Sequence, residues 1–219
     1  MHTLLLQLAD SAFPSGAFAH SAGLEALAQG GRLRGEAAVR ARLEELTWHT
    51  ALGALPFHDA AVSARGPALV AVDRACEVFL SNHVARRASV AQGRALLLAA
   101  ASLTPAVQRE PVAPLRELLP HAHLPVAFGA LMGACGLPLA DARHVFLFST
   151  ARSALSAVVR LGLVGPLRAQ GLLSELHPVL AAALAATEGR APDDALGVSP
   201  WLETAQAAHD RLYSRLFQS

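Results

Sequence analysis

The chain has 219 residues, a formal net charge of +1, and 16% charged against 53% hydrophobic residues, enough for one domain with a substantial core. All 18 basic residues are arginine, so the sequence excludes a lysine-dependent P-loop and Schiff-base catalysis. The near-zero net charge excludes the electrostatic footprint of a nucleic-acid-binding protein.

The composition favours helices. Alanine and leucine dominate and isoleucine is absent, so good helix formers far outnumber β-branched residues. We expect an all-α fold, a single-domain helical bundle of about ten helices over residues 1–219, with breaks at glycine and proline, including one at Thr104 and Pro105. The expected helices span 3–10, 20–30, 36–53, 56–65, 67–82, 85–103, 125–136, 139–164, 167–187 and 199–217.

A loop of small residues separates the first two expected helices. The serines, proline and glycine of residues 11–16 end the first helix, and Ser21, followed by Glu25, opens the second. Loops that rigid helices display are frequent functional sites. This loop displays Phe13, Phe18 and His20.

The segment 139–164 is apolar on almost every face, so we expect it in the centre of the bundle. Its polar exceptions form a narrow seam at helical spacing: Ser149, Ser153, Ser156 and Arg160. In one interpretation the serines bond back to helix carbonyls and the arginine caps a neighbour. In the other, the seam is the site of an all-helical small-molecule-binding protein or enzyme, and this alternative stays open.

Histidine and cysteine spacing predicts no closed metal site. His121 and His123 form an HxH pair and His58 precedes Asp59, but three or four ligands do not cluster in the sequence, so we assign no metal ligand and no cofactor. Cys76 and Cys135 are expected to be buried small hydrophobic residues. No GxSxG motif surrounds any serine, and we expect no catalytic residue and no enzyme.

The end of the chain combines a polar connector with an aromatic, arginine-rich segment. Residues 187–198 are expected to form a mobile loop that leads to a terminal partner-binding helix within 199–219. Tyrosine and arginine often supply the strongest contacts of protein interfaces. We therefore expect the terminal segment to be an interface anchor as well as a helix that docks on its own core.

Two segments far apart in the chain resemble the terminal signatures of one family, the urease accessory protein UreF. They are LLLQLADSAFPSGAFAHSAGLEAL at residues 4–27 and HDRLYSRLFQS at residues 209–219. The likeness continues in family order through VAQGRALL at 90–97, HLPVAFG at 123–129 and SALSAVVRLGLVG at 153–165. His20 stands where many members carry tyrosine.

The resemblance implies a UreF-like fold and a non-enzymatic adaptor. Such a protein is a homodimer that binds UreD, called UreH in some systems, and presents a surface to the GTPase UreG. The complex delivers nickel to apo-urease, and the adaptor modulates the GTPase activity of UreG. No cofactor is implied, transient contact with nickel stays open, and we expect no GTP hydrolysis by the chain alone.

The residues that we expect to contact partners lie in the segments that carry the resemblance. They are Phe13, Pro14, Gly16, Phe18, His20, Ser21, Gly23, Glu25, Gln92, Gly93, Arg94, His209, Tyr213, Arg215 and Phe217. We also expect His20 and Arg215 to meet when a partner orders both ends of the chain, because a neutral imidazole offers one acceptor nitrogen to a guanidinium.

The low charged fraction indicates apolar surface that self-association or a partner covers. The uncharged stretch 124–140 is interrupted by glycine and proline and is shorter than the ~20 residues of a spanning helix. Without a signal-peptide pattern, the expected location is the cytoplasm, with no membrane partner.

Overall fold

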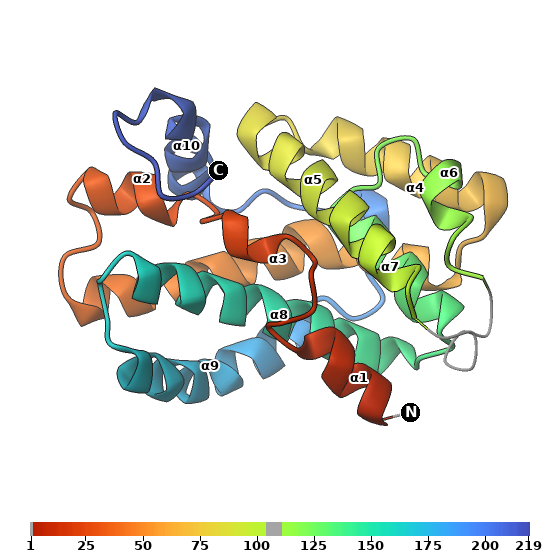
Figure 1. Ribbon diagram of the computed structural model, residues 1–219, viewed down its shortest axis with the longest axis horizontal. Helices are drawn as coiled ribbons and strands as arrows, with labels where there is room; N and C mark the ends of the chain where they lie inside the picture. The colour runs from red at the N-terminus through yellow and green to blue at the C-terminus, as the bar shows by residue number, and fades with distance from the viewer. Residues whose placement is uncertain (1, 104–110) are drawn as a thin grey trace.

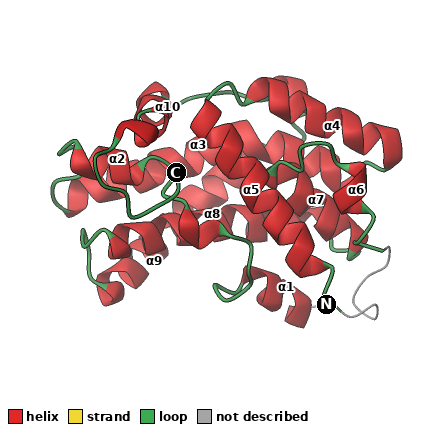
Figure 2. Cartoon of the chain, turned by 45° about the horizontal axis from the view of Figure 1, so that its top comes forward, coloured by secondary structure: helices red, strands yellow, loops and turns green. Residues whose placement is uncertain are grey.

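The computed structural model describes residues 2–103 and 111–219, and within them every regular element is a helix (Figures 1 and 2). The predicted all-α fold is confirmed, while the break predicted at Thr104 and Pro105 lies outside the described residues. The α-helices are α1 (His2–Ala9), α2 (Leu24–Gln29), α3 (Glu36–Ser63), α4 (Gly66–Phe79), α5 (His83–Ala100), α6 (Leu115–Leu118), α7 (Leu124–Ala134), α8 (Leu139–Arg160), α9 (Pro166–Ala186) and α10 (Pro200–Ala207). Short 3₁₀ turns are η1 (Ala17–Ala19), η3 (Pro192–Asp194) and η4 (His209–Arg211).

The long helix α3 runs through the middle of the bundle and packs against α4, α7, α8 and α9 (Figure 1). Two hydrophobic clusters lie along it. One contains Leu55 and Leu131, and the other contains Leu43, Leu155 and Leu172. The central helix is therefore α3. The sequence pattern favoured α8 for that place, but α8 covers one side of α3.

The prediction of two helices at 36–53 and 56–65 is wrong, because α3 is one helix of 28 residues that contains Pro56. Proline lacks the N–H that would bond to the carbonyl of residue 52. The backbone N–H of Leu196 donates to that Leu52 oxygen instead, at 3.0 Å. A tertiary hydrogen bond thus replaces the missing helical one, and it also attaches the connector between α9 and α10 to α3.

The helix predicted at 20–30 begins later than expected. Ala22 and Gly23 have φ angles of 51° and 85°, in the left-handed region, so α2 starts at Leu24. Ser21 does not cap it, because the cap position is Gly23. The four-residue helix α6 was not predicted from the sequence.

The prediction of a continuous terminal helix at 199–217 is also wrong. Ser199 caps the start of α10 by accepting the N–H of Leu202, but the helix ends at Ala207. A single 3₁₀ turn follows, and Leu212 then adopts an extended conformation. The last residues therefore run as an irregular segment, and its side chains follow no helical face.

A buried polar network joins α3, α8 and α9 in the core. His58 Nδ1 lies 2.9 Å from Asp59 Oδ1, and Arg143 Nε lies 3.1 Å from Asp59 Oδ2. Arg143 also donates to the Leu184 carbonyl and the Thr187 hydroxyl, both at 2.8 Å. Burial lowers the pKa of His58, so this imidazole is neutral at pH 7. The His58–Asp59 pair thus belongs to the core.

Both cysteines are buried and free, as predicted. Burial raises the pKa of the Cys76 thiol, and that of Cys135 to about 11, so both stay protonated at pH 7. Among the described residues, each helix is too short or too polar to cross a membrane.

Candidate functional site

The last residues of the chain fold back over the loop that precedes α2, so the two terminal signatures meet (Figure 1). The Gln218 N–H donates to the Ala19 carbonyl at 2.8 Å. The backbone N–H and the hydroxyl of Ser21 both donate to the Ser219 carbonyl, at 2.6 and 3.0 Å. We call this contact between residues 17–25 and 209–219 the terminal junction.

Glu25 is the buried anchor of the terminal junction, with 2% of its surface exposed. Its carboxylate accepts the backbone N–H of Leu216 at 2.6 Å and that of Phe217 at 3.2 Å. The buried His209 ring lies beside it, with Nδ1 at 3.8 Å from Glu25 Oε2, and Nε2 donates to the Phe217 carbonyl at 3.2 Å. Hydrogen bonds to an ionised acceptor are stronger than neutral ones, so Glu25 holds the terminal segment in place.

Arg160, the last residue of the polar seam, joins both signatures to α8. Its guanidinium carbon lies 3.7 Å from the ring centroid of Phe18 and 4.3 Å from that of Phe217. The same guanidinium donates a hydrogen bond to the Phe18 carbonyl. A cation between two aromatic faces is attracted by both, so Arg160 stabilises the terminal junction from its position at the end of α8.

His20 and Arg215 have different partners in the isolated chain. His20 Nδ1 lies 2.6 Å from the Ser219 hydroxyl oxygen, and Arg215 pairs with Asp210 at 3.7 Å. Their predicted contact in a partner complex stays a prediction. The pKa of His20 is lowered to about 4, chiefly by burial and to a smaller extent by the nearby charges of His209 and Arg87.

We expect His20 to titrate with a midpoint of about 4 in the folded protein. In the unfolded chain the His20 imidazole has its ordinary pKa of 6.5. Between pH 6.5 and pH 4 the unfolded state therefore binds more protons than the folded state, and His20 makes the protein less stable as the pH falls through this range. The measurement is an NMR titration of the imidazole signals, with the His20 signal assigned by its loss in His20→Asn. A midpoint within one unit of 6.5 would contradict the buried, neutral imidazole.

The predicted site residues divide by exposure. Exposed residues are Pro14, Gly16, Phe18, Arg94, Tyr213 and Arg215. Partly buried residues are Phe13, His20 and Gln92. Buried residues are Ser21, Gly23, Glu25, Gly93, His209 and Phe217. The buried side chains hold these segments against the rest of the protein. The exposed side chains are the ones that a partner reaches in this conformation.

Six of the predicted residues lie outside the two segments of the terminal junction: Phe13, Pro14 and Gly16 precede it in the N-terminal loop, and Gln92, Gly93 and Arg94 lie on α5. Phe13 packs against the first hydrophobic cluster, and Arg94 lies near the Pro120 carbonyl at 3.4 Å. At Gly93, α5 crosses the turn before α7 so closely that an added Cβ would lie 1.9 Å from the Ala122 oxygen. Gly93 is therefore a packing residue.

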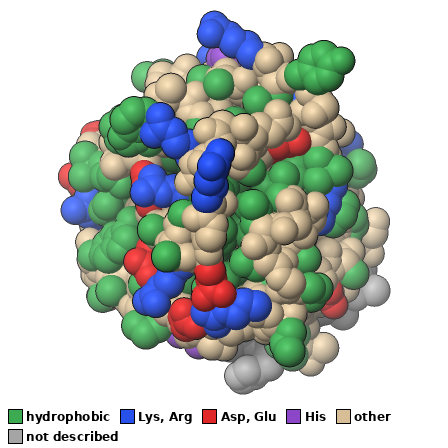
Figure 3. All heavy atoms as spheres, turned by 90° about the vertical axis from the view of Figure 1, so that its left-hand side faces the viewer, with side chains coloured by type: hydrophobic (Ala, Val, Ile, Leu, Met, Phe, Trp, Pro, Cys, Tyr) green, Lys and Arg blue, Asp and Glu red, His purple; other side chains and the backbone are tan. Residues whose placement is uncertain are grey.

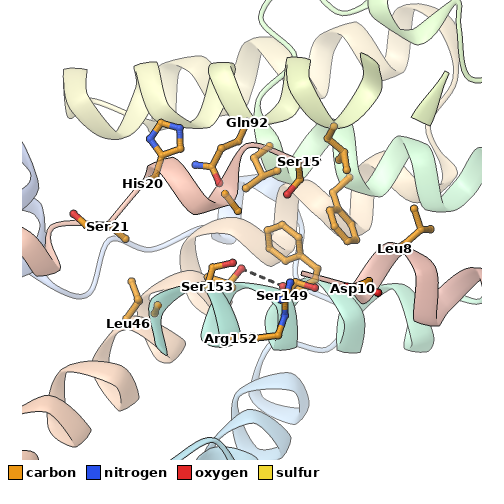
Figure 4. Close-up of a pocket in the computed structure, with 18 residues that line it drawn as sticks. Leu8, Asp10, Ser15, His20, Ser21, Leu46, Gln92, Ser149, Arg152 and Ser153 are labelled. Carbon is orange, nitrogen blue, oxygen red and sulfur yellow. Dashed lines mark hydrogen bonds between the residues drawn. The ribbon is translucent and has the colours of Figure 1, made fainter. Parts of the chain in front are cut away.

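The polar seam of α8 opens into a cavity of about 150 Å³ beneath the N-terminal loop. Figure 4 shows Ser153 reaching up from α8 and Gln92 down from α5 into this space, with His20 and Ser15 on the loop. The Ser149 hydroxyl and the Arg152 Nε are buried and make no hydrogen bond to the protein. The back-bonding expected for the seam is absent at Ser149.

A second polar cluster lies where α4 faces the turn before α7. Glu77 of α4 lies beside His121 and His123, and Asp73 holds the backbone of their turn. Burial lowers the pKa of His123. The HxH spacing drew attention to the two histidines, but no sequence pattern indicated the two carboxylates. These are more than 40 residues away and reach the turn only through tertiary packing.

The end of the molecule that carries α2 and α10 shows arginine and acidic side chains interspersed among hydrophobic ones (Figure 3). Arg32 lies over the exposed Trp201 ring at 5.4 Å, and Arg87 pairs with Asp210 at 2.7 and 3.1 Å. Because both signs of charge mix here, this face resembles the rim of a protein interface more than a surface for one kind of ion.

The sequence profile of the UreF family matches residues 33–177. The urease accessory protein F of Oryza sativa subsp. indica is 33% identical over 218 residues, which cover 96% of this chain and 82% of the rice protein. The Arabidopsis thaliana protein of the same name is 33% identical over 219 residues, covering 97% and 90%. The urease accessory protein UreF of Paenarthrobacter aurescens (strain TC1) is 33% identical over 221 residues, covering 98% and 96%.

Proposed function

Because this chain belongs to the UreF family of urease accessory proteins, we propose that it is the adaptor that links UreD (UreH) to the GTPase UreG during nickel delivery to apo-urease. An adaptor of this kind changes the relative free energies of the GTPase's states by binding them unequally. Its effect on GTP hydrolysis then appears only when UreG is present.

The observation that carries this proposal is the terminal junction. Hydrogen bonds that the buried Glu25 carboxylate accepts, together with stacking on Arg160, hold two irregular segments whose large aromatic side chains are exposed to solvent. Phe18 is 68% exposed and Tyr213 is fully exposed. Isolated surface residues of this size are ordinary, but here they lie on segments that the core anchors rigidly. Such a preorganised aromatic surface suits a protein partner, because little conformational entropy is lost on binding.

We expect Tyr213→Ala to weaken capture of UreD or UreG by about 2 kcal/mol, or about 30-fold, because exposed tyrosines often dominate interface energies. Its ring is fully exposed, so the substitution leaves helicity and thermal stability unchanged. The measurement is co-purification with UreD and UreG, singly and together, followed by titration of the complex that forms. Val78→Ala, at a largely exposed apolar position on α4 outside the terminal junction, is the matched control. If both variants bind as the parent protein does, the terminal junction is not the partner surface.

We also expect the isolated chain to form a homodimer. Large apolar side chains are exposed on several helices, including Leu6, Leu98 and Leu167, and a second subunit would cover part of this surface. Multi-angle light scattering at micromolar concentration measures the mass directly. A strict monomer across that range would contradict the homodimer.

The alternative function, binding of a small molecule in the polar seam, is supported by the cavity beneath the N-terminal loop. Ser149 and Arg152 bring unsatisfied polar atoms to that region, and a ligand with a carboxylate or phosphate group would match the guanidinium. A ligand that co-purifies with the parent protein, but not with Arg152→Ala, would favour this function over the adaptor. Capture of UreD and UreG by Arg152→Ala with unchanged affinity would show that the two functions are separate.

A further inference from the structure

Two histidines and a glutamate converge where the last turns of α4 face the turn before α7. Their nearest ligand atoms all lie within 4.8 Å of one another. Glu77 Oε2 is 2.8 Å from His123 Nε2 and 3.8 Å from His121 Nδ1. Ligand atoms bound at about 2.1 Å to one ion are separated by about 3 to 3.5 Å, so small side-chain adjustments suffice to close a metal site.

The backbone that presents both imidazoles is held by a buried carboxylate. Asp73 accepts the N–H groups of three consecutive residues, His121, Ala122 and His123, at 2.8, 3.0 and 3.0 Å. Ala122 is fixed at a φ of 59°, which alanine seldom adopts. This turn places the two rings face to face, with centroids 5.6 Å apart. Both therefore present nitrogen atoms to Glu77 without a rearrangement of the chain.

The groups around the three ligands leave the necessary lone pairs available. Arg86 binds the other carboxylate oxygen, Glu77 Oε1, at 3.1 Å. Arg87 is engaged with Asp210. His123 Nδ1 lies 3.3 Å from the Ser89 hydroxyl, which accepts the Leu124 N–H at 3.0 Å. The hydrogen on Nε2 of neutral His123 can therefore move to Nδ1, where the Ser89 oxygen accepts it, leaving Nε2 free to bind a metal.

We propose that Glu77 Oε2, His121 Nδ1 and His123 Nε2 bind one divalent ion of a late first-row transition metal, such as Ni²⁺ or Zn²⁺. Two imidazoles and one carboxylate suit these ions, and water completes the coordination. Glu77 and His121 line an open surface recess of about 410 Å³, which gives the ion access from solvent. The site does not depend on the adaptor function, since it needs no partner protein.

The test is equilibrium dialysis and isothermal titration calorimetry of the untagged full chain with Ni²⁺ or Zn²⁺ alone. We expect one saturable equivalent, and binding weakened more than about tenfold by His121→Ala or Glu77→Gln. His121 is part-exposed, so its replacement leaves far-UV circular dichroism and the metal-free thermal midpoint unchanged. Glu77→Gln also alters the bonds to Arg86 and His123, which is why His121→Ala is the decisive variant.

Two histidines outside the ligand set serve as controls. His83 lines the same recess and pairs with Asp210, whereas His177 is exposed on α9. We expect His83→Ala and His177→Ala to bind the metal as the parent protein does. X-ray absorption of the Ni²⁺-loaded parent protein should show two imidazoles, and that of His121→Ala one fewer. Absence of saturable binding, unchanged affinity in His121→Ala, or an equal loss in His83→Ala would each overturn the site, and none of them bears on UreD or UreG capture.

Discussion

Replacing Gly129 by alanine is expected to lower the free energy of unfolding by about 3 kcal/mol, because overpacking of a rigid contact costs this much. In the crossing of α7 over α3, a Cβ at this position would lie 2.2 Å from the His58 carbonyl oxygen and 3.1 Å from Ala61 Cβ. The obstacle is helix backbone, which cannot turn aside as a side chain would. For a chain of this length the thermal midpoint should fall by about 10 °C.

The matched control for Gly129→Ala is Gly197→Ala, in the connector before α10. No atom lies within 4 Å of the Cβ built there, so we expect a change within about 0.5 kcal/mol. Chemical denaturation followed by circular dichroism measures both variants. A loss in Gly129→Ala no larger than that in Gly197→Ala would mean that α3 and α7 are not in the close contact described here.

The second large effect is expected for Glu25→Ala, which should release the terminal segment. The variant leaves the N–H groups of Leu216 and Phe217 without their acceptor, and each charge-assisted bond contributes about 1.5–3 kcal/mol. Hydrogen exchange at these amides should accelerate at least about 100-fold, the equivalent of about 3 kcal/mol of local stability. Amides in α7 and in the part of α3 around Leu55, which belong to the other hydrophobic cluster, should keep their protection.

Two further variants separate this effect from a general loss of charge. Glu25→Gln keeps one side-chain carbonyl, so it can still accept one of the two bonds and should have an intermediate effect. Glu44→Ala removes an acid that pairs with Arg40 on the surface of α3, and its expected cost is below about 1 kcal/mol. If hydrogen exchange at Leu216 and Phe217 is unchanged in Glu25→Ala, the carboxylate does not hold the terminal segment.

Glu25→Ala also relates the terminal junction to the proposed adaptor. We expect this variant to lose capture of UreD or UreG together with its terminal order, whereas Tyr213→Ala loses capture and keeps that order. If Glu25→Ala releases the segment but binds both partners normally, the docked conformation is not the one that partners recognise.

Much of the fold was accessible from the sequence because helices depend on local composition and periodicity. The all-α class, the helices near α4, α5, α7, α8 and α9, and the buried free cysteines were predicted and confirmed. The errors lie where a tertiary contact overrides a local signal. Pro56 does not end α3, because Leu196 satisfies the freed carbonyl, and the terminal helix stops at Ala207, with Glu25 and His209 binding the backbone beyond it.

For the candidate site, the sequence identified the segments but not their contacts. Phe18, His20, Glu25, His209 and Phe217 were chosen from two signatures nearly 200 residues apart, and the fold brings those signatures together. No local pattern pairs His20 with Ser219, or places Arg160 between two aromatic rings. The Asp73 and Glu77 side chains were missed for the same reason, since their role depends on a turn about 45 residues later.

The sequence by itself determined the helical class, the approximate position of most helices, the absence of lysine chemistry and the likeness to the UreF family. These properties follow from residue types, short-range periodicity and motif order, all of which can be read without knowing any tertiary contact. Only the tertiary structure decided that α3 is the central helix, that the terminal segment docks on the N-terminal loop, and that His121 and His123 meet a glutamate. Each of these depends on close packing and on hydrogen bonds between residues far apart in the chain, and such contacts are specified by the whole fold and by no single segment.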